Sequence, residues 1–95
     1  MTILLVEQRV PDFDTWKAAF DSDPVGREEG GVRGYRISRP IDDPNTVFVA
    51  LEFDGSDEAE AFREKLHGLW SRIESQGLIE GPRASILEVL EAKEY

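Results

Sequence analysis

Apolar and polar residues divide the chain into six regular segments, and the order of these segments restricts the fold most strongly. Four segments have the alternating pattern of strands, and two have the three- or four-residue spacing of helices. We predict strands over residues 2–10, 32–39, 46–53 and 83–91, and helices that begin after Asp12 and at Ser56 or Asp57. The order strand, helix, strand, strand, helix, strand predicts an α+β, ferredoxin-like βαββαβ fold, a four-stranded antiparallel sheet with two helices on one face.

Each predicted helix carries one apolar stripe and recognisable end signals. Asp12 stands at the capping position of the first helix, and Gly77 stands where a left-handed residue ends the second. The connection over residues 21–31 is rich in helix breakers and has room for one short turn after Pro24. The stripes consist of Phe13, Trp16 and Phe20 in the first helix and of Phe62, Leu66, Leu69, Trp70 and Ile73 in the second.

The strands are apolar on more than one face. In residues 46–53 one face is wholly apolar and is expected to meet the helices, whereas the opposite face carries Phe48, Ala50 and Glu52. A sheet face in water alternates more cleanly between polar and apolar residues. A second sheet, most simply that of a second copy of the chain, is therefore expected to cover this face in a homodimer. In the last strand two phases compete, with Ala84, Ile86 and Leu90 on one face and Leu87 and Val89 on the other.

The sheet face opposite the helices, which carries Phe48, is the first candidate for a ligand site, because polar side chains lie there among apolar ones. Arg36 could orient an anionic or phenolic oxygen, Phe48 could supply apolar contact, and Glu7 or Glu52 could act as a base if burial raised its pKa. The candidate ligand-binding residues are therefore Glu7, Arg36, Phe48 and Glu52, and no catalytic residue is identified. In the alternative interpretation these charged groups pair with one another inside the sheet interface.

Composition excludes several classes of function. The chain of 95 residues is expected to be one domain over residues 1–95, and its 40% hydrophobic and 33% charged residues are typical of a globular protein. Twenty acidic against eleven basic residues, a net charge of −9, argue against a nucleic-acid partner. Residues 46–53 also carry an acid where an RNA-binding strand would stack bases. No membrane segment is visible, and a chain without cysteine suits the cytoplasm, which is the expected location.

Neither a metal nor a cofactor is expected. His67 is the one histidine of the chain, so a site built on several imidazoles is excluded. It lies off the apolar stripe of its helix and is expected to be exposed. Trp16 and Trp70 lie within the stripes and are most simply core residues, although Trp70 is at the edge of its stripe and could form part of a pocket mouth.

Four segments resemble the dimeric α+β barrel proteins related to antibiotic-biosynthesis monooxygenases. These segments are Asp12–Lys17 with Phe20, Gly31–Arg36, Asp42–Asn45 and Asp57–Phe62. The resemblance implies a ferredoxin-like fold whose sheets pack face to face in a homodimeric barrel. Relatives include cofactor-independent oxygenases of polycyclic phenols, haem-degrading enzymes and small cyclases. Haem-degrading relatives use an Asn on the first strand and a His after a Trp on the second helix, and this pattern is not met here.

Two functions follow from these observations. One is a cofactor-independent monooxygenase or cyclase that acts on an aromatic or polyketide-like molecule between the sheet and the helices. The other is a non-catalytic ligand-binding or accessory dimer that uses the same cavity. The missing catalytic set favours the second function, and the resemblance favours the first.

Overall fold

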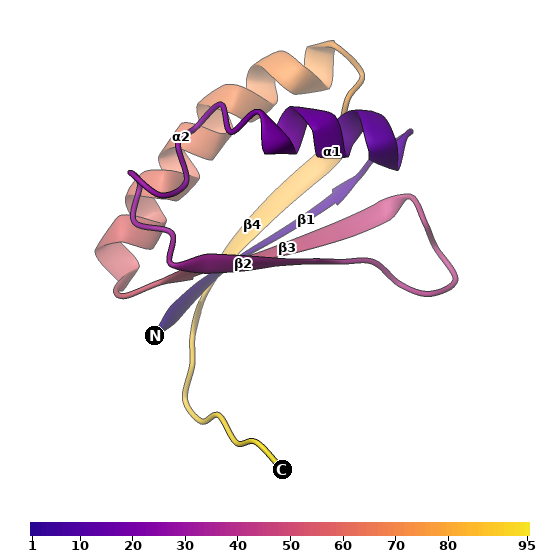
Figure 1. The fold of residues 1–95 in the computed structure, drawn as a ribbon. Coiled ribbons are helices and arrows are strands. Elements are labelled where there is room, and N and C mark those ends of the chain that lie inside the picture. Colours follow the sequence, from indigo (N-terminus) through magenta and orange to yellow (C-terminus); the bar gives the residue numbers. More distant parts are fainter.

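The computed structural model describes residues 1–95 and contains six regular elements in the predicted order (Figure 1). The strands are β1 (Thr2–Arg9), β2 (Gly34–Ser38), β3 (Thr46–Phe53) and β4 (Glu80–Glu88), and the helices are α1 (Phe13–Asp21) and α2 (Ser56–Ser75). The strands form one antiparallel sheet in the order β2-β3-β1-β4, and both helices lie on one face of it (Figure 1). The predicted ferredoxin-like α+β fold is confirmed.

The core lies between the sheet and the two helices. The two central strands, β1 and β3, bury alternate residues there, in accord with their apolar sequences. Register resolves the phase of β4, because Leu4 pairs with Ile86 and Ile3 pairs with Leu87. Ile86 therefore lies on the helix face, and Leu87 lies on the opposite face, which we call the open face. The buried hydrophobic residues are Leu4, Val6, Val10, Trp16, Val47, Val49, Leu51, Phe53, Ala59, Phe62, Trp70 and Ile79.

The structure corrects the predicted bounds of the last strand. β4 begins at Glu80 and ends at Glu88, so that Gly81 and Pro82 lie inside the strand instead of before it. The pairing with β1 shifts between Glu7 and Arg9, and Gly81 has the left-handed φ of 57° that such a bulge favours. Pro82 is tolerated because β4 is an edge strand. Turn residues therefore form a bulge within the strand.

Other bounds shift for local reasons. The second strand begins at Gly34 instead of Val32, because the Val32 N–H bonds back to the Arg27 carbonyl in the preceding turn. Gly55 takes the capping position of α2, which we predicted for Ser56 or Asp57. Asp12 takes the predicted capping position of α1, but its carboxylate accepts a hydrogen bond from the Thr15 hydroxyl and none from a backbone N–H of the helix. The prediction for Gly77, with a φ of 75°, is confirmed.

The loop between β2 and β3 is organised by one carboxylate. The carboxylate of Asp43 accepts hydrogen bonds from the Thr46 hydroxyl (2.6 Å), the Asn45 backbone N–H (3.1 Å) and Arg9 (3.3 Å). These interactions, led by the bond from Thr46, lower the pKa of Asp43 from its ordinary value of 3.8. The carboxylate is thus held in its ionised form in the folded protein.

Acid should weaken the fold partly through this loop. A carboxyl whose pKa is lowered on folding stabilises the folded state above its unfolded pKa, and this stabilisation is lost as the pH falls through the folded pKa. We expect the free energy of unfolding to decline below about pH 4, and to decline less steeply in Asp43→Asn. Urea unfolding between pH 7 and pH 2.5 measures this, with Asp42→Asn in the same loop as control. Equal slopes for wild type and Asp43→Asn would contradict it.

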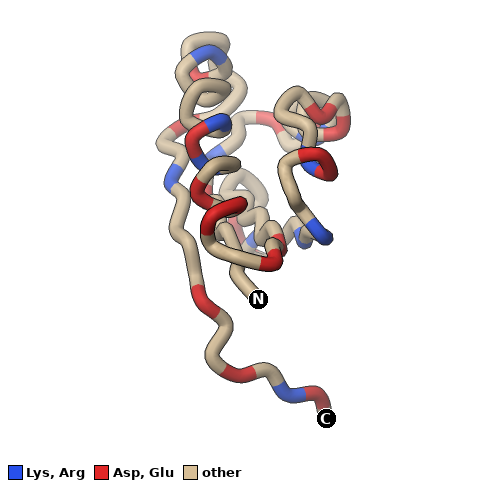
Figure 2. The backbone as a smooth tube through the Cα atoms, turned by 90° about the vertical axis from the view of Figure 1, so that its left-hand side faces the viewer, with Lys and Arg blue, Asp and Glu red and all other residues tan.

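Charged side chains are spread over the surface of the molecule, including the outside of α2 and the segment after β4. Figure 2 shows acidic and basic residues along α2 and along the C-terminal arm, residues 89–95, which leaves the body of the molecule. Neither helix combines the length and apolar character that a membrane crossing requires. Leu90 and Tyr95 in the arm are fully or almost fully exposed.

Candidate functional site

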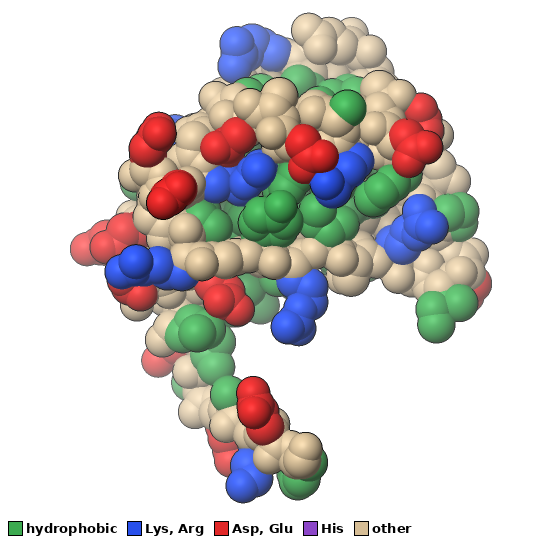
Figure 3. Space-filling view, viewed as in Figure 1, with side chains coloured by type: hydrophobic (Ala, Val, Ile, Leu, Met, Phe, Trp, Pro, Cys, Tyr) green, Lys and Arg blue, Asp and Glu red, His purple; other side chains and the backbone are tan.

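Helix α1 stands away from the rest of the fold. None of its Cα atoms lies within 8 Å of a Cα atom in another helix or strand, whereas α2 approaches β1, β3 and β4 within that distance. A side-chain contact bridges the gap, because Phe20 of α1 meets Tyr35 of β2 edge to face with ring centres 5.1 Å apart. Within α1, Trp16 stacks on Phe20 at 5.2 Å. Figure 3 shows apolar side chains filling the band between α1 and β2. Because the backbone of α1 is held away from the sheet, space remains between this helix and the sheet.

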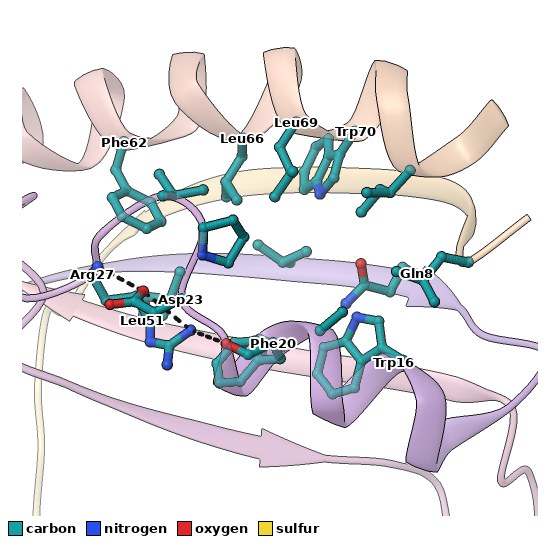
Figure 4. A pocket seen from close by; sticks show the side chains of 17 residues that line it. Gln8, Trp16, Phe20, Asp23, Arg27, Leu51, Phe62, Leu66, Leu69 and Trp70 are labelled. Atoms are coloured by element: carbon teal, nitrogen blue, oxygen red, sulfur yellow. Dashed lines mark hydrogen bonds and ion pairs between the residues drawn. The ribbon is translucent and has the colours of Figure 1, made fainter. Parts of the chain in front are cut away.

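A cavity of about 90 Å³ lies between the helix face of the sheet and the two helices (Figure 4). Thirteen of its 17 lining residues are hydrophobic. The indole rings of Trp16 from α1 and Trp70 from α2 both line it, and these residues are 4% and 6% exposed. The predicted core tryptophans are therefore confirmed as core residues and are cavity walls as well. Such an apolar hollow with a few polar groups is typical of a small-molecule site.

Gln8 is the polar residue buried in this wall. It is 4% exposed and follows Leu4 and Val6 on the helix face of β1. In Figure 4 its amide points into the cavity at the end that carries Trp16 and Trp70. The bulge in β4 lies beside it, because Glu7 and Arg9 have partners in β4 and Gln8 has none. Bulges are frequent beside functional sites, where they re-aim a side chain.

Arg27 and Asp23 close the opposite end of the cavity. The Arg27 guanidinium donates to the Phe20 carbonyl at 2.8 Å and lies 3.5 Å from the Asp23 carboxylate (Figure 4). The guanidinium carbon, Cζ of Arg27, lies 3.9 Å from the centre of the Phe20 ring, which is a cation–π contact. The Arg27 side chain is only 17% exposed. Both charged residues of the wall are therefore paired with each other and held by neighbours.

The four predicted ligand-binding residues lie on the open face, outside this cavity. Register places Glu7 opposite Phe48 and Arg36 opposite Ala50, with Glu52 on the same face. Glu7 accepts a hydrogen bond from Arg83 of β4 at 3.2 Å. Arg36 and Glu52 form no ion pair within the chain, so the alternative in which the three charges pair with one another is not seen in one protomer. Their binding of a ligand stays a prediction.

Sequence reasoning missed all three polar or charged residues of the cavity wall, Gln8, Asp23 and Arg27. Gln8 had a signal, because it continues the buried phase of Leu4 and Val6 with a polar side chain. Arg27 had none, since a basic residue in a loop is ordinarily solvated. Its position depends on how residues 21–31 fold back under α1.

His67 is exposed, as predicted, with its ring 5.5 Å from that of Trp70. The fold gathers no group of three or more His, Asp or Glu side chains that could hold a metal ion.

No family model and no curated protein matches the sequence. Solved structures do match over almost the whole chain. A candidate antibiotic biosynthesis monooxygenase from Nitrosomonas europaea is 21% identical, with a TM-score of 0.61 over 96% of this chain and 100% of that one. A dimeric ferredoxin-like protein from an uncultured marine organism is 10% identical, with a TM-score of 0.64 over the full length of both chains.

A variant of MhuD with two manganese protoporphyrin IX molecules bound per active site is also similar. It is 12% identical, with a TM-score of 0.67 over 100% of both chains. At these identities the similarity establishes the fold. The chain has the ferredoxin-like fold of antibiotic biosynthesis monooxygenase-like proteins, which confirms the fold that the sequence resemblance implied.

Proposed function

We propose that the protein is a homodimer that binds a small, flat, largely apolar molecule, of aromatic or polyketide-like character, between the sheet and the helices. The observation that carries this proposal is the apolar cavity beneath α1. Its volume of about 90 Å³ is well below the range of about 300–1,000 Å³ common for ligand pockets. The cavity as it stands suits a single ring, and a larger ligand requires α1 to move outward.

Homodimer formation is supported by the open face. Ile3, Leu5 and Phe48 are half-buried there, and Leu87 is 43% exposed. Such a face is more apolar than a solvated sheet surface. The similar marine protein is named as a dimer. We propose that the open faces of two copies pack together, with Glu7, Arg36, Phe48 and Glu52 in the interface.

The proposed ligand is either a substrate or a molecule that is bound without reaction, and these two interpretations require different chemistry of the cavity. Several structural neighbours are named as antibiotic biosynthesis monooxygenases, which favours the monooxygenase interpretation. The cavity favours non-catalytic binding, because its titratable residues are Asp23 and Arg27, which already bond to each other. A general base must reach the proton that it abstracts, and a paired carboxylate at one end of the cavity is poorly placed for that. We therefore propose binding as the primary function.

Filling the cavity tests the proposal. Ala19 of α1 lines the cavity, and a phenylalanine there would occupy the space proposed for the ligand. We expect Ala19→Phe to weaken the binding of small aromatic probes, toluene and phenol, at least tenfold while the protein stays folded. The indole N–H signals of Trp16 and Trp70 in NMR titrations report this binding directly.

The neighbouring residue supplies a matched control. Ala18 is exposed on the outer side of the same helix, so Ala18→Phe adds the same ring outside the cavity. It should bind the probes as wild type does. If wild type binds neither probe, or if Ala19→Phe binds both normally, the cavity is not the site.

A further inference from the structure

Gln8 interrupts an otherwise apolar series of buried side chains. Leu4, Val6 and Gln8 on the helix face of β1 are 0%, 4% and 4% exposed, and Val10, just after the strand, is 1% exposed. A primary amide in such a series carries two N–H donors and one carbonyl acceptor that need partners. An apolar residue of the same length would fill this position without that requirement.

The Gln8 amide has no partner within the protein. Its side chain takes part in none of the 17 side-chain hydrogen bonds of the fold, from Arg9 to Arg83. Every polar side-chain atom that is fully enclosed does have a partner. The small exposed area of Gln8 must therefore belong in part to its amide, and Gln8 lines the cavity. An unpaired buried amide is costly, so a partner inside the cavity would stabilise it.

The surroundings of Gln8 select a neutral partner. The two charged residues of the wall, Asp23 and Arg27, lie at the other end of the cavity (Figure 4) and bond to each other. A charged group beside Gln8 would be buried without a counter-ion, which is strongly unfavourable. A hydroxyl or carbonyl oxygen on an aromatic ring can bond to the amide, while the ring contacts Trp16 and Trp70.

We propose that Gln8 determines ligand specificity by hydrogen bonding to a neutral oxygen atom carried by the aromatic ligand. This inference rests on the proposed function, because it concerns the same cavity. It adds that the ligand is oriented with its oxygen toward β1 and that the ligand binds as the uncharged molecule. Arg27 and Asp23 then close the opposite end without contacting the oxygen.

Phenol and toluene form a matched pair of probes, since each has one ring and one substituent of a single heavy atom. An apolar cavity alone prefers toluene, the more hydrophobic of the two. We expect wild type to bind phenol at least as tightly as toluene. Gln8→Met keeps the length of the side chain and removes the amide, and it should shift the ratio of the two Kd values toward toluene by about five- to tenfold. Gln76→Met, an exposed position after α2, should leave the ratio unchanged.

The outcomes separate this inference from the proposed function. Binding of neither probe to wild type would remove both. Binding of both probes with toluene preferred by wild type, or with the same ratio in Gln8→Met, would overturn the role of Gln8 and leave the cavity as a site. The wild-type preference is decisive even if Gln8→Met fails to fold. If it folds, Gln8→Met should be at least as stable as wild type without ligand, because it no longer buries an unpaired amide.

Discussion

Phe48→Asp is expected to convert the proposed homodimer into monomers. Register places Phe48 on the open face opposite Glu7 and Ser38, at the centre of the proposed interface. In the proposed dimer an aspartate there would be buried in an apolar interface directly opposite the Glu7 carboxylate, and burial of such a charge costs several kcal/mol. The dissociation constant should rise by about 10²- to 10⁴-fold. Sedimentation equilibrium at micromolar concentration, where wild type is expected to be dimeric, measures the change.

The loop between β2 and β3 offers a control of the same chemistry. Ile41 is fully exposed, so Ile41→Asp replaces an apolar residue with the same charge outside the interface and should leave the dimer intact. A stable wild-type monomer at micromolar concentration would contradict the account of the open face. So would a Phe48→Asp variant that is as dimeric as wild type.

Trp16→Ala is expected to cause a large loss of stability. Trp16 is 4% exposed and joins a series of rings, 5.7 Å from Phe13 and 5.2 Å from Phe20 between ring centres. The backbone of α1 approaches no other element within 8 Å, so the helix is attached through side chains, and Trp16 is the buried one among them. Removal of a buried tryptophan costs about 3–5 kcal/mol. The melting temperature should fall by roughly 15–30 °C.

The milder substitution Trp16→Phe tests whether the ring at this position attaches α1 to the rest of the protein. Trp16→Phe keeps a ring in the series and should lose less than half as much of the free energy of unfolding as Trp16→Ala. Hydrogen exchange of the α1 amides should accelerate in Trp16→Ala more than exchange in β1 or β3. A Trp16→Ala protein that melts within a few degrees of wild type would show that α1 is held by other contacts.

The fold could be predicted from the sequence because each element carries its own pattern. Val47, Val49, Leu51 and Phe53 alternate as a strand must, and both helices carry a stripe. The bounds of β4 could not be predicted in the same way. Gly81 and Pro82 are typical of turns, and only the pairing of β4 with β1 shows that they form a bulge inside a strand.

The site was harder to predict, because a cavity depends on distances between elements. The sequence shows that Trp16 faces inward, but not that α1 stands far enough from the sheet to leave a space beneath it. The mixture of polar and apolar residues on the open face instead indicated Glu7 and Arg36 as candidate ligand-binding residues. The same reasoning applied to the buried face would have found Gln8, whose amide stands among aliphatic residues.

A crystal structure of the protein with phenol bound would show directly whether the cavity is the ligand site. We expect one phenol molecule per protomer between α1 and the sheet, with its ring against Trp16 and Trp70 and its oxygen within hydrogen-bond distance of the Gln8 amide. Phenol found instead on the open face, among Arg36, Phe48 and Glu52, would contradict the account and support a site at that face.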